Sequence, residues 1–235
     1  MSRRGIVLTL LVALSVITYL DRVCIAIAGP RMQAELGLSP ERWGWVLGVF
    51  AIAYGLFEIP AGALGDRFGQ RAVLTRIVLG WSAFTALTGC VSTYGTLLVT
   101  RLLFGVGEAG AYPNMAGSIG RWFPPDGRAR AQGAIWAASR LGGALAPWLV
   151  VPIMAALGWR AAFWIFGAAG LAWAAAWTAW YRDPPAGKAD WRPELVEAEM
   201  STAHAGTPWG RLFRAPQLWL LMGMYWCYVW GSMFY

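Results

Sequence analysis

The chain has 235 residues, of which 58% are hydrophobic and 13% are charged. Because a soluble domain carries about 25% charged residues, this composition excludes an ordinary water-soluble fold and indicates a protein that faces lipid. The net charge of +7 does not indicate a nucleic-acid-binding protein, since the basic residues are spread over alternate loops and do not gather on one face.

Six apolar runs each have close to the roughly 20 residues that a helix needs to cross the hydrocarbon core of a bilayer. They cover residues 6–28, 43–64, 72–91, 96–118, 131–157 and 161–181, and a seventh run begins at Leu218 and is still apolar at Tyr235. The runs lack the alternation that is typical of barrel strands. The sequence therefore predicts an all-α membrane protein, with a six-helix N-terminal bundle followed by the beginning of a seventh transmembrane helix.

The first run also has features of a cleaved signal peptide, with Arg3 and Arg4 before it and a small-residue triplet at 26–28 near its end. Two features oppose cleavage. The run exceeds the roughly 7–15 apolar residues of a signal peptide, and Asp21 and Arg22 lie between this stretch and the cleavage point. We therefore expect the run to be the first membrane span.

Arginines cluster before the first run and after the second, fourth and sixth runs, whereas the intervening loops are nearly neutral or balanced in charge. The positive-inside rule therefore places the N-terminus and these arginine-rich loops in the cytoplasm. Lys188 is the only lysine among the 19 lysine and arginine residues. This bias is typical of a GC-rich bacterium, so we expect a multi-pass protein of a bacterial inner membrane.

Residues 182–217 form the one long polar segment, which is rich in proline and glycine and has a short surface helix predicted at 193–200. The segment divides the chain into an N-terminal transmembrane domain at 1–181, a central cytoplasmic loop at 182–217 and the start of a C-terminal transmembrane domain at 218–235. Transporters often use doubled architectures. We expect the chain to hold the first of two six-helix halves, as a fragment or a truncated product in preference to one of two associating copies. It would then need a C-terminal six-helix half as its partner.

The loop after the second run contains the sequence GALGDRFGQRAVL, which combines glycines with a compact set of charges. Gly62 and Gly69 permit tight turns and close helix approach, and Asp66 lies near Arg67 and Arg71 in the sequence. A basic loop would satisfy membrane topology without this fixed order of residues. The segment resembles the signature of the major facilitator superfamily at almost every position. The resemblance implies a gate motif that closes the cytoplasmic side by pairing with the opposite half.

Five charged residues of the apolar runs are expected to be buried: Asp21 and Arg22 in the first, Arg101 and Glu108 in the fourth, and Arg140 in the fifth. Each would cost roughly 2.5–3.5 kcal/mol if it faced lipid at the centre of a helix, so they must point inward, pair or meet water. An internal ion-pair network that only holds helices together is one explanation. A pathway for a solute and an ion is preferred, because the excess of arginines over acids favours an organic anion.

Arginine presents a planar fork that binds a carboxylate through two hydrogen bonds and stays charged at any accessible pH. Asp21 and Glu108 can instead gain and lose protons. When they are ionised they compete with the solute for Arg22 and Arg101, and once they are protonated they release these arginines to the anion. Solute and proton are therefore expected to bind cooperatively, as linkage requires.

The same residues, together with GLFEIPAG in the second run, GWRAAF before the sixth and MYWCYVWGSMFY in the seventh, look like the anion:cation symporter family. That branch carries sugar acids, aromatic acids and, in other members, phosphate or glutamate. The resemblance implies that Asp21 and Glu108 couple protons and that Arg22 binds a substrate carboxylate. It further implies that Arg101 orients Glu108 and that Tyr54 lines the substrate cavity.

Arg140 departs from this pattern, because related sugar-acid carriers often have an uncharged polar residue at its position. We place it in the substrate site, where it would serve a second carboxylate or a bulkier acid. Glu58 near the end of the second run is either a third titrating group or, as we prefer, a packing residue beside Pro60.

The sequence therefore predicts a secondary active transporter for a sugar acid or another carboxylate, working by proton symport and alternating access within membrane lipid. A sodium-coupled or uncoupled carrier and a non-transporting nutrient sensor on the same scaffold remain alternatives. A membrane enzyme is not expected, since no nucleophile–base pairing is present and the single histidine, His204, falls in the long loop. Cys24, Cys90 and Cys227 lack metal-ligand spacing, so neither a metal nor another cofactor is expected.

Overall fold

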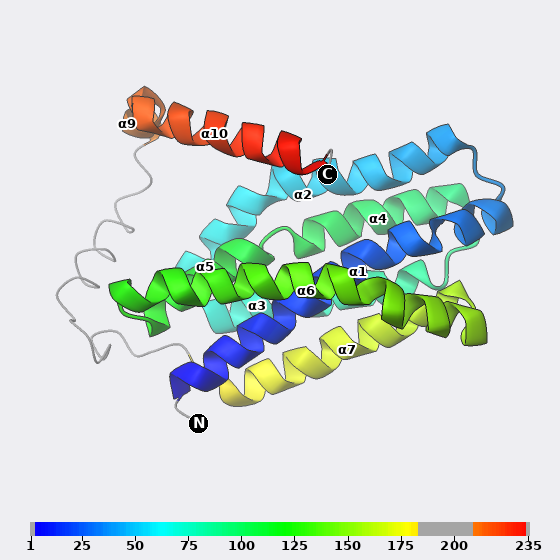
Figure 1. The fold of residues 1–235 in the computed structure, drawn as a ribbon, viewed down its shortest axis with the longest axis horizontal. Coiled ribbons are helices and arrows are strands. Elements are labelled where there is room, and N and C mark those ends of the chain that lie inside the picture. Colours follow the sequence, from blue (N-terminus) through cyan, green and yellow to red (C-terminus); the bar gives the residue numbers. More distant parts are fainter. Residues whose placement is uncertain (1–2, 183–208, 234–235) are drawn as a thin grey trace. The chain divides into compact units, whose positions relative to one another are not determined.

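The computed structural model describes residues 3–182 and 209–233, and all regular structure in these two ranges is α-helical (Figure 1). The chain divides into two units, Met1–Trp191 and Arg192–Tyr235. The first unit contains α1 (Arg3–Leu36), α2 (Pro40–Phe68), α3 (Gln70–Thr88), α4 (Tyr94–Glu108), α5 (Ala111–Trp122), α6 (Pro125–Leu157) and α7 (Trp159–Trp180). The second unit contains α9 (Trp209–Arg214) and α10 (Pro216–Met233). The short helix predicted at 193–200 lies outside the described residues.

The first unit forms the predicted bundle of six spans. Four of its helices are each long and apolar enough to cross a membrane: α1, α2, α6 and α7. Helix α3 has 19 residues, while α4 and α5, with 15 and 12 residues, together cover the fourth apolar run. The seventh run corresponds to α10, with 18 residues.

The fourth run is predicted as one helix, but the structure breaks it between α4 and α5. Pro113 explains the break, since it has no N–H to donate to the carbonyl oxygen of Ala109 and its ring clashes with that carbonyl in a regular helix. Asn114 strengthens the turn that follows, because its backbone N–H and its Nδ2 both donate to the carbonyl oxygen of Gly110, at 3.1 and 2.6 Å. Helix α4 therefore ends at Glu108, directly before the break.

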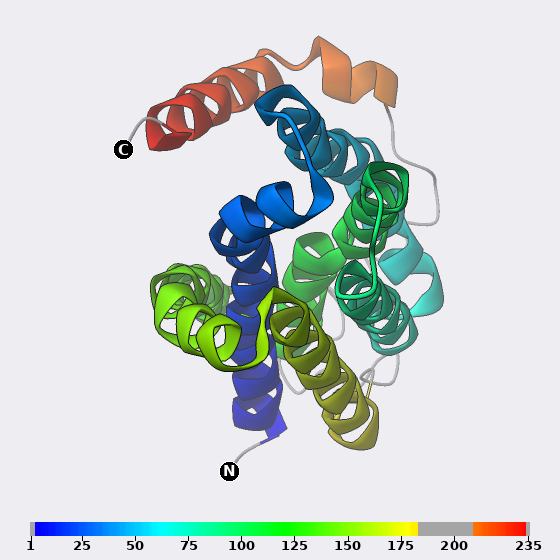
Figure 2. The same cartoon turned by 90° about the vertical axis from the view of Figure 1, so that its right-hand side faces the viewer.

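Helix α1 packs against both α6 and α7, while α3 packs against α7 and α4, and α2 packs against α4 (Figures 1 and 2). Two glycines permit close approaches between helix backbones. A Cβ atom at Gly142 of α6 would lie 2.6 Å from the carbonyl oxygen of Val16 in α1. A Cβ atom at Gly105 of α4 would lie 2.7 Å from the carbonyl oxygen of Phe50 in α2. Small residues of this kind let helix backbones approach closely in a membrane.

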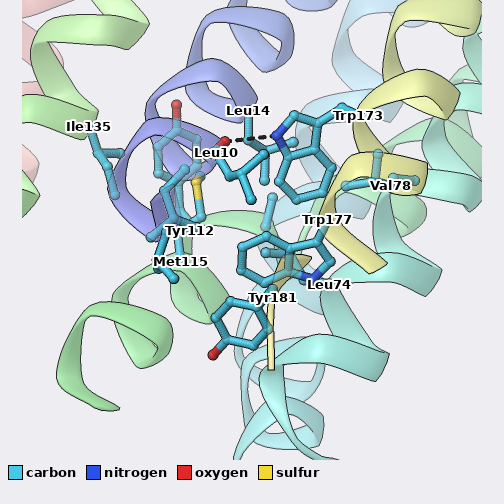
Figure 3. Close-up of a cluster of buried hydrophobic side chains, with 14 of the residues drawn as sticks. Leu10, Leu14, Leu74, Val78, Tyr112, Met115, Ile135, Trp173, Trp177 and Tyr181 are labelled. Carbon is cyan, nitrogen blue, oxygen red and sulfur yellow. Dashed lines mark hydrogen bonds between the residues drawn. The ribbon is translucent and has the colours of Figure 1, made fainter. Parts of the chain in front are cut away.

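A cluster of buried aromatic and aliphatic side chains holds α1 against α3 and α7 (Figure 3). The indole Nε1 of Trp173 donates to the carbonyl oxygen of Leu10 at 2.7 Å. Trp177 stacks on Tyr181 with ring centroids 3.9 Å apart. This packing fixes the part of α1 that precedes Asp21, and so positions the charged residues that follow.

Candidate functional site

Four of the charged residues predicted for the membrane interior come together between α1 and α4. The Nε atom of Arg22 donates to Oε1 of Glu108 at 2.8 Å, which makes an ion pair between the two helices. The Glu108 side chain is fully buried, whereas the Arg22 side chain keeps 24% of its surface exposed. Asp21 and Arg101 are both buried. These four residues, here named the charged cluster, therefore avoid the cost of facing lipid.

Aromatic rings surround the guanidinium group of Arg22. The ring of Tyr54, the residue predicted to line the cavity, is nearest at 4.4 Å from the guanidinium carbon to the ring centroid. The corresponding distances are 5.5 Å for Phe50, 5.8 Å for Tyr19 and 6.0 Å for Tyr112. Such contacts attract a cation to the ring face. They hold the guanidinium group in place even when its carboxylate partner changes.

Asp21 occupies a different part of the charged cluster, next to helix α3. Neither of its carboxyl oxygens has a well-formed hydrogen bond within the described part of the chain. Trp81 and Thr85 lie beside this carboxyl group, and their Nε1 and Oγ1 atoms also lack a well-aligned partner there. The charges of Glu108 and Arg101 act on it as well. The buried carboxyl group of Asp21 therefore lies near two hydrogen-bond donors, Trp81 and Thr85, and near the cation of Arg101.

Arg101 lies deeper than Arg22, with its guanidinium carbon 4.5 Å from the ring centroid of Phe104 and 5.0 Å from that of Phe50. Within the described residues, its Nε has no hydrogen-bond partner, and the same holds for Oε2 of Glu108 and Nη2 of Arg22. Buried polar atoms in proteins are nearly always hydrogen-bonded. The unsatisfied atoms of the charged cluster are therefore suited to bind a small polar species.

Arg140 differs from the charged cluster because its side chain is exposed, on α6. One turn before it, Trp136 stacks on Tyr112 with ring centroids 5.0 Å apart and an interplanar angle of 7°. Tyr112 is in turn one of the rings around Arg22. The structure thus places Arg140 on a helix that contacts the aromatic surroundings of Arg22, outside the buried cluster itself.

Glu58 lies close to this site. The hydroxyl of Tyr54 donates to its Oε1 at 3.4 Å, one helical turn along α2. Tyr54 thereby connects Glu58 with Arg22, so a role for Glu58 beyond packing stays open as a prediction.

A cavity of about 120 Å³ lies between α2 and α3. It is lined by Ala61, Leu64, Phe68, Val73, Arg76 and Ile77. Its walls are mainly apolar and include no residue of the charged cluster, so we do not assign it to a charged solute.

The predicted gate motif begins near the end of α2 and continues into α3. Its buried Gly65 packs so closely that a Cβ atom there would lie 1.6 Å from Oδ1 of Asn114. Arg71 donates to the carbonyl oxygen of Thr178, which ties the start of α3 to the end of α7. Asp66 and Arg67 are exposed. The glycine and Arg71 therefore stabilise the bundle, while the exposed pair stays accessible.

Sequence reasoning missed the α5 residues that receive this motif. Asn114 donates from Nδ2 to the carbonyl oxygen of Ala61 at 3.1 Å, and Arg121 donates from Nη2 to that of Gly65 at 3.3 Å. It also missed Trp81 and Thr85. Trp81 and Thr85 are four residues apart and so share one face of α3, but their sequence spacing alone does not indicate that this face meets Asp21.

Comparisons with known proteins agree on one family. Residues 11–235 match the profile described as Major Facilitator Superfamily. The chain is 35% identical to the protein named "Probable sulfoacetate transporter SauU" of Cupriavidus necator, over 99% of this chain and 55% of that protein. It is 33% identical to the "Probable L-galactonate transporter" of Escherichia coli, over 88% of this chain and 47% of that protein.

A solved structure gives the same result for the fold. A bacterial homolog to the human lysosomal transporter Spinster, in an inward-facing and unoccupied conformation, has a TM-score of 0.72 at 26% identity. The match covers 91% of this chain and 49% of that one. The chain therefore spans about half the length of the relatives that it matches.

Proposed function

Because the chain belongs to the major facilitator superfamily, we propose that its six-helix bundle is the N-terminal half of a secondary transporter that carries an organic anion with protons. Transport would proceed by alternating access against a C-terminal six-helix half. Relatives named for sulfoacetate and for L-galactonate support an organic anion as the solute.

The observation that carries this proposal is the ion pair between Arg22 and Glu108, 2.8 Å apart. The Arg22 side chain is partly exposed and the Glu108 side chain is fully buried, so an anion would approach the pair from the arginine side. Protonation of Glu108 removes its charge and frees the guanidinium fork for a carboxylate or sulfonate of the solute. Binding of the anion therefore favours binding of a proton, and the reverse follows by linkage.

The surroundings of Asp21 support protons over sodium as the coupling ion. Its neighbours Trp81 and Thr85 carry N–H and O–H groups, and the Arg101 charge lies close. A metal cation at this carboxyl group would meet the Arg101 charge with little water to screen it. A proton needs only the carboxyl oxygen itself.

The orientation of the bundle follows from its loops. We place the N-terminus and the gate motif on the cytoplasmic side of a bacterial inner membrane, where arginine-rich loops are retained. Asp66 and Arg67 are exposed and are free to approach the second half when the cytoplasmic side closes. Gly62 and Gly69 belong to the same motif, and Gly62 contacts α5 closely enough that a Cβ atom would lie 2.9 Å from Cβ of Pro113.

Uptake measurements on the complete transporter in proteoliposomes test the proposal. Labelled sulfoacetate, phthalate and galactonate are offered with the outside more acidic than the inside, with equal pH on both sides, and with a sodium gradient alone. We expect at least one anion to accumulate against its gradient, faster as the external pH falls and without sodium. A flat pH profile would favour an uncoupled carrier, and dependence on sodium would replace the proton as the coupling ion.

A further inference from the structure

One face of α6 connects Arg140 with the aromatic rings around Arg22. Trp136, Arg140 and Gly143 follow one another at spacings of four and three residues, so they share this face. Trp136 stacks on Tyr112 at 5.0 Å. A Cβ atom at Gly143 would lie 3.6 Å from Cδ1 of Tyr19. Arg140 is thus flanked on its own helix by two residues that contact rings of the Arg22 surroundings.

Both of these rings also reach the guanidinium group of Arg22. Its carbon lies 5.8 Å from the ring centroid of Tyr19 and 6.0 Å from that of Tyr112. We name the rings of Tyr19, Tyr112 and Trp136 the aromatic floor. Arg22 on α1 lies next to the aromatic floor, and Arg140 on α6 lies one helical turn from Trp136, which belongs to it. Arg22 is partly exposed and Arg140 is exposed, so the described residues close off neither side chain.

We infer that the solute is a two-headed anion, with two carboxylate or sulfonate groups on a short spacer that carries few hydroxyls. One acidic group binds Arg22 after Glu108 is protonated, and the other binds Arg140. The positions of the two arginines support this assignment, because Arg22 lies on α1 in the charged cluster and Arg140 lies on α6 outside it. The inference rests on the proposed function and specifies the solute class of the same site.

Two serine hydroxyls beside the aromatic floor already donate hydrogen bonds within the protein. Ser15 donates from Oγ to the carbonyl oxygen of Ile135 at 2.8 Å and lies 3.2 Å from the hydroxyl oxygen of Tyr112. Ser139 donates to the carbonyl oxygen of Trp136 at 2.7 Å. A sugar acid would lose water from several hydroxyls against the ring faces, which is costly for each hydroxyl that finds no new partner. A flat or apolar spacer would instead lie against the rings.

Pairs of anions that differ by one acidic group measure how much the second acidic group contributes to binding. In the complete transporter, we compare phthalate with benzoate, and sulfoacetate with acetate, as competitors of uptake, with galactonate as the hydroxyl-rich probe. The wild-type protein is expected to prefer each two-headed anion by about tenfold or more, which corresponds to one charged hydrogen bond. Galactonate is expected to compete less well than phthalate or sulfoacetate.

The variants Arg140→Ala and Arg140→Lys test the residue itself. Arg140→Ala should remove the preference for two-headed anions, while the affinity for benzoate and acetate stays within about twofold. Arg140→Lys should retain part of the preference, because the charge remains but the planar fork is lost. Arg130→Ala, an exposed arginine on the same helix, serves as the matched control and should change neither affinity.

The outcomes distinguish this inference from the proposed function. If uptake is normal but the wild-type protein binds one-headed and two-headed anions alike, or if Arg140→Ala leaves the preference intact, the two-headed solute is excluded and the transporter remains. Strong competition by galactonate would likewise overturn the hydroxyl-poor spacer. If the wild-type transporter carries no organic anion, the proposed function fails and this inference fails with it.

Discussion

Replacing Asp21 with asparagine is expected to abolish accumulation of the anion against its gradient and to leave exchange measurable. Asparagine has nearly the shape of a protonated aspartate, but it cannot take up or release a proton. A gradient of one pH unit stores about 1.4 kcal/mol per coupled proton, enough for about tenfold accumulation. The Asp21→Asn carrier should reach an accumulation ratio of about 1, because a solute that moves without its coupled ion only equilibrates.

Two assays on the same proteoliposomes separate coupling from binding. Uptake driven by a pH gradient reports coupling, and exchange of labelled for unlabelled anion at equal pH reports binding and conformational change. Asp126→Asn is the matched control, because Asp126 is exposed in the first turn of α6. The Asp126→Asn carrier should accumulate the anion normally. Equal loss of both activities in a folded Asp21→Asn protein would show that Asp21 is structural.

Replacing Arg22 with alanine has the second large expected effect, on both anion binding and stability. The change removes the fork that holds the solute and leaves the buried carboxyl of Glu108 without its partner at 2.8 Å. Breaking a buried ion pair costs about 3–5 kcal/mol. We therefore expect a lower Tm in detergent, together with loss of anion binding by about 100-fold or more, as for removal of a charged hydrogen-bond donor.

The double variant Arg22→Ala with Glu108→Gln separates these two effects. Its neutral amide removes the uncompensated buried charge, so the double variant should regain most of the lost Tm. Anion binding should stay lost, because the guanidinium group is still absent. A double variant that binds the anion with wild-type affinity would remove Arg22 from the substrate site.

The energetic cost of a charge in lipid explains why the sequence predicts that Arg22 and Glu108 point away from it. A charge within an apolar run must find a polar partner, and Arg22 and Glu108 meet between α1 and α4 for this reason. The same argument could not place Arg140. It states that a charge avoids lipid, but not where the side chain then lies, and here Arg140 is exposed on α6.

Two other features differ from the sequence-based expectation, because the mean hydropathy of a run hides the effect of single residues. The break between α4 and α5 follows from Pro113, yet the run that contains it is long and apolar enough to read as one span. Trp81 and Thr85 read as ordinary residues of a membrane helix, and their position beside Asp21 depends on how α3 packs against α1 and α4. Such neighbours come from tertiary structure, which a single sequence does not specify.

Anion and proton bind together in this mechanism because the solute and Glu108 compete for Arg22. Calorimetric titration of the complete transporter with phthalate or sulfoacetate, in two buffers of different ionisation enthalpy at one pH, counts the protons taken up per bound anion. We predict net proton uptake by the wild-type protein at a pH where the ion pair is intact, and reduced uptake by the Glu108→Gln variant. Tight anion binding by the wild-type protein with no proton uptake at any pH would contradict the mechanism.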